Sequence, residues 1–201
     1  MTTAIVLLCI LAALLELDTT YVGQLSFSRP IIAGPLFGLI TGDIMAGIQV
    51  GVFTELLFAD ISPLGGIIPP SGVMCAAIPM ILYSLGIELY FGFFLGVIAG
   101  IAYGQLDKWM RKARFKWMVF LEKNATARPG AFSRTVIMLI ISAFLLNLIF
   151  ISVCAWVCTQ LMYNIVAYIP LKMYAAFKFA YMAVPWIGLA TLIPAFRLKT
   201  R

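Results

Sequence analysis

The sequence predicts an all-α membrane protein, a polytopic bundle of about six or seven helical segments. Of its 201 residues, 63% are hydrophobic and 11% are charged, whereas a soluble domain carries about a quarter charged residues. Apolar runs recur along the chain between short polar breaks, without the residue alternation of a transmembrane β-barrel. We therefore expect a single integral membrane domain over residues 1–201 and no soluble domain.

The apolar runs predict the helices one by one. The first, over 3–17, has no Lys or Arg before its apolar core and no A-x-A-like site, so we expect a retained helix rather than a cleaved signal peptide. Glu16 and Asp18 are interpreted as ending this helix. The last two helices are long enough to span a bilayer and form a C-terminal pair over 134–196. The remaining helices are expected over 30–42, 43–60, 72–86 and 87–106, and the last two over 134–161 and 171–196.

The region 24–86 differs from the rest because its segments are short for a hydrocarbon core of about 30 Å. Proline and glycine break it at Pro30, at Pro35 and above all in "SPLGGIIPPSG" at 62–72. Irregular backbone at membrane depth is tolerated only where protein buries it or where it lines a cavity. We therefore expect re-entrant or broken helices here. Interrupted segments of this kind also indicate a transporter's binding site.

Glycines spaced four apart predict close helix packing. One ridge consists of Gly34, Gly38 and Gly42, and a second of Gly92, Gly96, Gly100 and Gly104. We interpret the second ridge as general helix packing. Asp43, which follows the first ridge, is interpreted as a turn or helix-cap residue.

Basic residues cluster at two places and predict the topology. Eight of the fourteen Lys and Arg lie between Lys108 and Arg134, and three more close the chain at 197–201. By the positive-inside rule, the loop expected over 107–134 and the C-terminus are cytoplasmic. We interpret these charges as topogenic and in contact with lipid headgroups. Nucleic-acid binding is the weaker interpretation, because the run is tethered to a bilayer.

The chain carries few of the groups that catalysis or metal binding would need. It has no His, and no P-loop, G-x-S-x-G or CxxC motif. We therefore expect no metal site, no cofactor and no enzymatic activity of the chain by itself. Its four cysteines lie in apolar stretches and are interpreted as buried thiols: Cys9, Cys75, Cys154 and Cys158.

Glu55 is a carboxylate inside the apolar run "GIQVGVFTELLF" at 47–58. Gly47, Gly51 and Glu55 follow one another at four-residue intervals, so they share the small-residue face that packs against protein. An ionisable group within the membrane is a hypothesis of function by default. The alternative is an interfacial residue or a structural ion pair with Arg29. We favour a functional intramembrane acid.

The stretch "FSRPIIAGPLFGLITGDIMAGIQVGVFTELLF", followed by "PLGGIIPPSG", resembles the IIC subunit of the mannose–fructose–sorbose type of the bacterial phosphotransferase system. The order and spacing of the pieces make the resemblance specific, and they cover about residues 15–80. The matching pieces are Arg29-Pro30, Gly42-Asp43, "FTELL" and the Gly65-Gly66…Pro69-Pro70 loop.

The resemblance implies a multi-pass sugar permease subunit of the bacterial inner membrane. Such a IIC subunit pairs with a IID membrane subunit and acts in an oligomer. It passes a hexose or an amino sugar inward, where cytoplasmic IIA and IIB proteins, phosphorylated on histidines, supply the phosphate. The absence of His from this chain agrees with that division of labour.

The resemblance also implies site residues. Glu55 stands at a sugar-binding position, and the Gly/Pro loop contributes to the same cavity. Independently of the resemblance, Arg29 is a candidate charge partner because it is the nearby cation in the sequence. The candidate substrate-binding residues are Glu55, Gly65, Gly66, Pro70 and Ser71. Two departures are present: Ser71 stands where the family commonly has Asp, and the chain is shorter than typical members.

Two other functions remain open at this stage. One is a non-transporting membrane partner that keeps the fold for assembly or regulation. The other is a transporter of a different small solute, with Glu55 as a proton or ion site. A sugar site should be uncharged overall and rich in hydrogen-bonding groups, whereas a proton-coupled site needs Glu55 to titrate.

Overall fold

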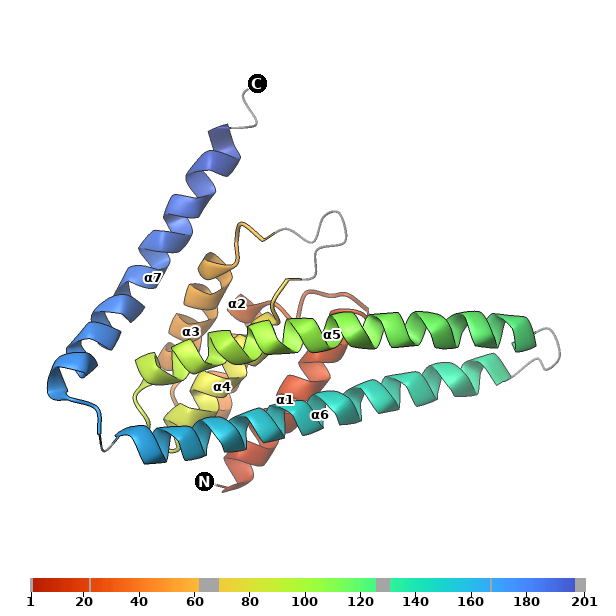
Figure 1. Cartoon of the computed structure of the whole chain (residues 1–201), viewed down its shortest axis with the longest axis horizontal. Helices are drawn as coiled ribbons and strands as arrows, with labels where there is room; N and C mark the ends of the chain where they lie inside the picture. The colour runs from red at the N-terminus through yellow and green to blue at the C-terminus, as the bar shows by residue number, and fades with distance from the viewer. Residues whose placement is uncertain (1, 22, 62–68, 126–130, 167, 198–201) are drawn as a thin grey trace.

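The computed structural model of the chain describes residues 2–21, 23–61, 69–125, 131–166 and 168–197 (Figure 1). All regular structure in these ranges is helical, which confirms the predicted all-α fold. The helices are α1 (Thr2–Leu17), α2 (Pro30–Thr41), α3 (Ile44–Leu57), α4 (Gly72–Ser84), α5 (Leu89–Ala125), α6 (Ala131–Val166) and α7 (Leu171–Arg197).

Three of the described helices are long and apolar enough to cross a membrane. They contain the apolar stretches Leu89–Phe115, Val136–Val166 and Lys172–Ile193. The four helices α1 to α4 are apolar but shorter. At 1.5 Å per residue, a helix of this length does not reach across a core of about 30 Å. The short segments expected in region 24–86 are thus present, while their path through the membrane stays a prediction.

The long helix α5 corrects one prediction. We expected this helix to end at 106 and a loop to cover 107–134, but α5 continues to Ala125 and α6 begins at Ala131. Residues 107–125 contain no Pro or Gly and are rich in good helix formers, so nothing in them stops the helix. We predicted a loop because this stretch is polar. Polar residues allow a helix to lie in water, but they do not end it. Pro129 and Gly130, where the sequence does break, lie outside the described residues.

Helices α2 and α3 form a hairpin in which the two backbones touch. A Cβ atom on Gly34 would lie 2.8 Å from the Cα of Gly51, and one on Gly38 would lie 3.2 Å from the Cα of Gly47. Only glycines allow this approach. The hairpin places the residue before α2 beside the end of α3.

The turn of this hairpin is built by Gly42 and Asp43. Gly42 has a φ of +84°, the left-handed conformation that ends many helices, so it caps α2 and does not extend the glycine ridge. Asp43 Oδ1 accepts a hydrogen bond from the Ala46 amide at 3.0 Å, which begins α3. The prediction of a cap residue at Asp43 is confirmed.

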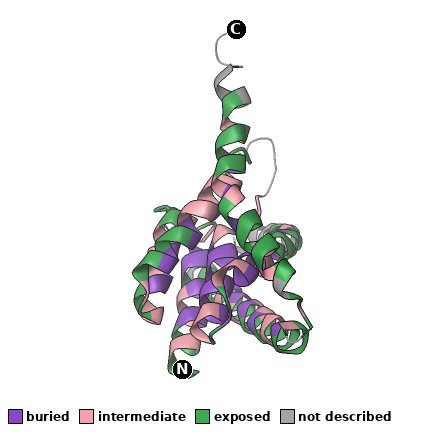
Figure 2. Cartoon of the chain, turned by 90° about the vertical axis from the view of Figure 1, so that its left-hand side faces the viewer, coloured by how far each residue is buried: buried purple, intermediate pink, exposed green. Residues whose placement is uncertain are grey.

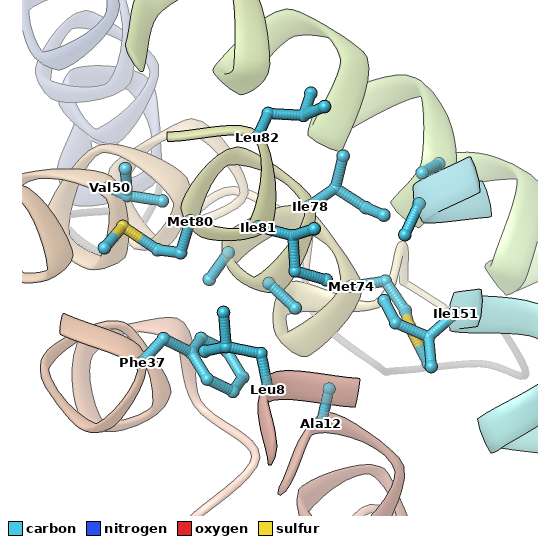
Figure 3. Close-up of a cluster of buried hydrophobic side chains, with 14 of the residues drawn as sticks. Leu8, Ala12, Phe37, Val50, Met74, Ile78, Met80, Ile81, Leu82 and Ile151 are labelled. Carbon is cyan, nitrogen blue, oxygen red and sulfur yellow. The ribbon is translucent and has the colours of Figure 1, made fainter. Parts of the chain in front are cut away.

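Helix α4 is the centre of the hydrophobic core. Ten of its thirteen residues are buried, and buried residues gather in the middle of the bundle in Figure 2. Apolar side chains from four other helices surround α4 (Figure 3): Leu8 and Ala12 of α1, Phe37 of α2, Val50 of α3 and Ile151 of α6.

The second glycine ridge packs α5 directly onto α4. A Cβ on Gly92 would lie 2.9 Å from the Cα of Pro79, and one on Gly100 would lie 2.7 Å from the carbonyl oxygen of Ser71. A Cβ on Gly104 would lie 3.4 Å from the Cα of Pro70, which is an ordinary van der Waals contact. The ridge therefore packs helices, as expected, and it also supports the segment that leads into α4.

Helices α6 and α7 are mostly exposed along their apolar lengths. Only 17% of each spanning stretch is buried within the chain, against 44% for α5. Helix α7 stands away from the bundle toward the C-terminus in Figure 1. Their outer faces are apolar, which suits contact with lipid or with another membrane subunit.

Candidate functional site

A cavity of about 390 Å³ lies where three segments of the broken region meet. The start of α2, the end of α3 and the residues before α4 each contribute to it. Its walls combine the cation of Arg29, the carboxylate of Glu55 and several apolar rings. The rings belong to Pro30, Phe58, Pro69 and Pro70. The cavity thus brings together chain positions that are far apart in the sequence.

An ion pair stands at the edge of this cavity. Arg29 Nη1 donates to Glu55 Oε1 at 3.2 Å, and the Ile31 amide at the start of α2 donates to Glu55 Oε2 at 3.5 Å. The N-terminus of a helix leaves amide groups without intrahelical partners and favours an anion nearby. The Glu55 carboxylate is therefore held by a cation and a helix end together.

The ion pair remains partly accessible. The Glu55 side chain is 28% exposed and that of Arg29 is 64% exposed. An exposed pair of this kind adds at most about 1 kcal/mol to stability. Glu55 is thus paired with Arg29, an arrangement that the alternative of a structural ion pair also expects. Because both groups still face open space, they retain hydrogen-bonding capacity for a ligand.

The other predicted site residues are distributed unevenly. Pro70 lines the cavity. Ser71 is buried: its hydroxyl accepts from the Met74 amide at 3.1 Å, capping α4, and donates to Glu16 Oε2 at 2.6 Å. Gly65 and Gly66 lie in 62–68, outside the described residues.

Sequence reasoning treated Glu16 and Asp18 only as the end of the first helix, and it missed their contacts with the site region. Glu16 accepts the hydrogen bond from Ser71, one residue from Pro70. Asp18 Oδ1 accepts from the Leu25 amide at 2.8 Å, in the loop that leads to Arg29. The available signal was two carboxylates in "LELD", at the end of an apolar helix.

A second cavity, of about 520 Å³ and mostly apolar, lies near the opposite end of α3. Its walls include Asp43, Gln49 and Tyr83, and the Tyr83 hydroxyl donates to Asp43 Oδ2 at 2.8 Å. The carboxylate of Asp43 is already engaged by the α3 cap and by Tyr83. The Glu55 carboxylate is bonded by two partners as well, but of these two cavities only that of Glu55 carries a cation and borders the Pro-rich break, so we take it as the candidate site.

Metal-binding geometry is not found in the part of the chain that the structure describes. No group of three or more Cys, Asp or Glu residues in that part is arranged to hold an ion. The cysteines are free thiols: Cys9 and Cys75 are buried, and Cys154 and Cys158 are half-buried. Burial among apolar neighbours agrees with their interpretation as small apolar residues.

Comparison with known proteins identifies relatives along the whole chain. A family model described as the sorbose-specific IIC component of the phosphotransferase system, EII-Sor, matches residues 2–200. The chain is 30% identical over 174 residues to N-acetylgalactosamine permease IIC component 1 of Escherichia coli K12, covering 82% of this chain and 62% of that protein. It therefore spans less than two thirds of that relative's length.

Two further comparisons agree. Putative N-acetylgalactosamine permease IIC component 2 of Escherichia coli K12 is 38% identical over 52 residues, which are 26% of this chain and 39% of that protein. A solved structure described as "Structure of membrane protein" superimposes with a TM-score of 0.73, covering 98% of this chain and 85% of that one. At 22% identity, this second match supports the fold alone.

Proposed function

The chain belongs to the family of sorbose-specific IIC components of the phosphotransferase system, and we propose that it binds a hexose or an amino sugar and carries it across the bacterial inner membrane. Separate IIA and IIB proteins then phosphorylate the sugar. The observation that carries this proposal is the Arg29–Glu55 pair, open to a cavity at the break in the short helices.

The pair suits a neutral, hydroxyl-rich ligand. A carboxylate only accepts hydrogen bonds and a guanidinium only donates them. Together they can therefore bond both the hydrogen and the oxygen atoms of neighbouring sugar hydroxyls. Each hydrogen bond to a charged group contributes about 1.5–3 kcal/mol. Phe58, Pro69 and Pro70 supply apolar surface for the C–H faces of the ring.

The same geometry argues against an ion site. Arg29 already places a positive charge 3.2 Å from the Glu55 carboxylate, so a transported cation would meet repulsion from the guanidinium. A neutral solute meets no such penalty. The proposed sugar contacts are therefore Glu55, Arg29 and Pro70, together with Gly65 and Gly66 of the 62–68 segment.

Ser71 enters the proposal indirectly. Its hydroxyl is uncharged and turned toward Glu16, so this wall of the cavity has one carboxylate fewer than the Pro-Pro-Asp pattern of the resemblance. A site with a single carboxylate beside an arginine is neutral overall. That balance favours an uncharged sugar, including N-acetylated ones, over a sugar bearing a free ammonium group.

Phosphorylation falls to other chains in this proposal, because the sequence has no His that could carry a phosphoryl group. A IID-type subunit and lipid cover the exposed apolar faces of α6 and α7, and the assembly is oligomeric. The basic end of α5, the start of α6 and the C-terminus lie in the cytoplasm, following the concentration of Lys and Arg there.

The test is sugar uptake by cells that produce this chain with its IID, IIA and IIB partners. N-acetylgalactosamine and sorbose are the first probes, since the matched relatives are named for them. Glu55→Gln keeps one acceptor and should weaken uptake affinity by about 10- to 100-fold, the loss of one or two charge-assisted bonds. Glu55→Leu should abolish uptake without loss of membrane insertion, since a costly polar group is removed.

Glu88→Gln is the matched control, because Glu88 is an exposed carboxylate before α5. It should transport at the parental rate. Normal uptake by Glu55→Leu would contradict the site. If neither the parental chain nor any variant supports sugar uptake, the result would instead favour a partner subunit that does not transport. Loss of protein in both Glu55 variants would show that the pair is structural.

A further inference from the structure

Two buried carboxylates lie at the end of α1, and the proposed function has no role for them. Glu16 is in the last turn of α1 and Asp18 follows the helix. Their exposed fractions are only 4% and 8%. Acidic side chains are rarely buried to this extent unless hydrogen bonds compensate for lost hydration. Here the compensating bonds run to two different segments of the candidate site.

The bond from Glu16 holds the segment before α4. Ser71 lies between Pro70 and Gly72, and both of these line the cavity. The Ser71 hydroxyl donates to Glu16 Oε2 at 2.6 Å, a short hydrogen bond between two buried groups. The Ser71 amide donates to the Gly100 carbonyl at 3.1 Å. One residue in the middle of the cavity wall is thus fixed from α1 and from α5.

The bonds from Asp18 hold the loop that carries Arg29. Asp18 Oδ1 accepts from the Leu25 amide at 2.8 Å, and Oδ2 accepts from the amide and hydroxyl of Ser28 at 3.3 and 3.5 Å. Gln24 and Ser26 in this loop have φ values of +48° and +67°. Non-glycine residues adopt this region at a cost and keep it only where neighbouring groups impose it.

The two segments also meet each other. A Cβ atom on Gly72 would lie 2.6 Å from Cδ of Pro30, so the residue after Arg29 packs directly on the residue after Ser71. A shift of either segment would therefore move the other. Because the distance between a guanidinium and a sugar hydroxyl must hold within a few tenths of an ångström, such a shift would weaken ligand binding.

We infer that Glu16 and Asp18 are positioning residues. They bond to the two walls of the cavity on the side away from the ligand and keep the walls at a fixed distance from each other. Glu16 fixes the Pro69–Gly72 wall, and Asp18 fixes the loop that brings Arg29 to Glu55. Neither side chain needs to touch the sugar. The effect on sugar affinity rests on the proposed function, whereas the effect on the two walls does not.

Hydrogen exchange on the purified full-length protein tests the positioning without any sugar. Glu16→Leu should accelerate amide exchange about 10-fold or more in a peptide covering 71–76, and Asp18→Leu should do so in a peptide covering 23–30. Glu16→Gln and Asp18→Asn keep an oxygen acceptor and should change these rates by less than about 3-fold. Exchange in α7 should stay unchanged in all four variants.

A general loss of stability would raise exchange everywhere, α7 included, and would overturn the inference. Unchanged exchange in both peptides would overturn it as well. Glu16→Ala provides the same test if Glu16→Leu does not fold, because it removes the acceptor without adding bulk and leaves the Ser71 cap of α4 in place. It should accelerate amide exchange more in the 71–76 peptide than in the 23–30 peptide, which responds only through the contact between Pro30 and Gly72.

Sugar affinity, measured on the complex with the IID partner, gives the second readout. Glu16→Leu and Asp18→Leu should raise the Kd for N-acetylgalactosamine or sorbose by about 10-fold, with Glu88→Gln at the parental value. Faster amide exchange in a wall peptide together with an unchanged Kd would refute the positioning role and would not contradict the proposed permease function. If the parental protein binds neither sugar, the proposed function fails, while exchange in the two peptides still decides whether the carboxylates hold the walls.

Discussion

The short helices and the long helices of this protein are stabilised in different ways. Helices α2 and α3 meet backbone to backbone at glycines, and α4 is almost wholly buried between its neighbours. Helices α6 and α7 bury only 17% of their spanning stretches within the chain. One region depends on close fit inside the protein. The other depends on an apolar surface that lipid or a partner covers.

The comparison also shows where polar chemistry can be placed in such a protein. A short helix ends within the bundle, and its last backbone groups need partners there. Arg29, Glu55, Glu16 and Ser71 all lie at or beside such ends. A long helix satisfies its own backbone across the apolar layer, so it supplies surface rather than binding groups. We therefore expect substitutions to act very differently in the two regions.

The largest effect should come from enlarging a glycine in the short-helix region. Gly34→Val places its Cβ 2.8 Å from the Cα of Gly51, and backbone cannot yield as a side chain can. We expect a loss of about 3 kcal/mol, the upper end of overpacking penalties, and little monodisperse protein in detergent. Ala176→Val, on an exposed position of α7, should leave the apparent Tm unchanged. Similar Tm values for both variants would remove the distinction between the regions.

A smaller effect should follow from a buried polar bond between the long helices. The Tyr103 hydroxyl donates to Asn147 Oδ1 at 2.7 Å, and Asn147 Nδ2 donates to the Ala13 carbonyl at 3.4 Å. Asn147→Leu should cost about 1.5 kcal/mol, since interhelical polar bonds in membranes are modest. Gln160→Leu, exposed on the same helix, is the control and should be neutral in thermal unfolding. A neutral Asn147→Leu would mean that apolar packing alone joins α5 and α6.

The smallest of these effects should arise at the turn of the α2–α3 hairpin. Asp43→Ala removes the α3 cap and the partner of the Tyr83 hydroxyl, with an expected loss of about 1 kcal/mol. Asp43→Asn keeps the capping oxygen and should recover most of that loss. Tyr83→Phe separates the two contributions, because it leaves the cap intact. If Asp43→Asn is as unstable as Asp43→Ala in thermal unfolding, the charge rather than the cap matters.

Much of the architecture follows from local features of the sequence. Apolar runs of sufficient length form helices at any position in a membrane, because only a helix satisfies its own backbone there. The boundaries of α1 to α4 therefore lie close to the predicted ones. The pairing of Arg29 with Glu55 was also open to prediction, since few other charges occur in that region. The end of α5 was missed because polarity was read as a helix stop.

The supporting contacts of the cavity could not be read in the same way. Ser71 and Glu16 are 55 residues apart, and only the packing of α1 beside α4 brings them within 2.6 Å. In the sequence, Ser71 was expected to face the ligand together with Pro70. The fold turns its hydroxyl to the opposite side, because α4 needs a cap and Glu16 needs a donor.

The sequence by itself thus determined the helical class, the short and broken N-terminal half, and the carboxylate and arginine of the candidate site. These features depend on composition and on spacing within one segment, where hydrophobicity and backbone constraints act locally. Only the tertiary structure decided which side of the 69–72 segment faces the cavity, and it assigned Glu16 and Asp18 to the cavity walls. Such contacts join distant segments, and their geometry is set by how helices pack, which a local pattern does not encode.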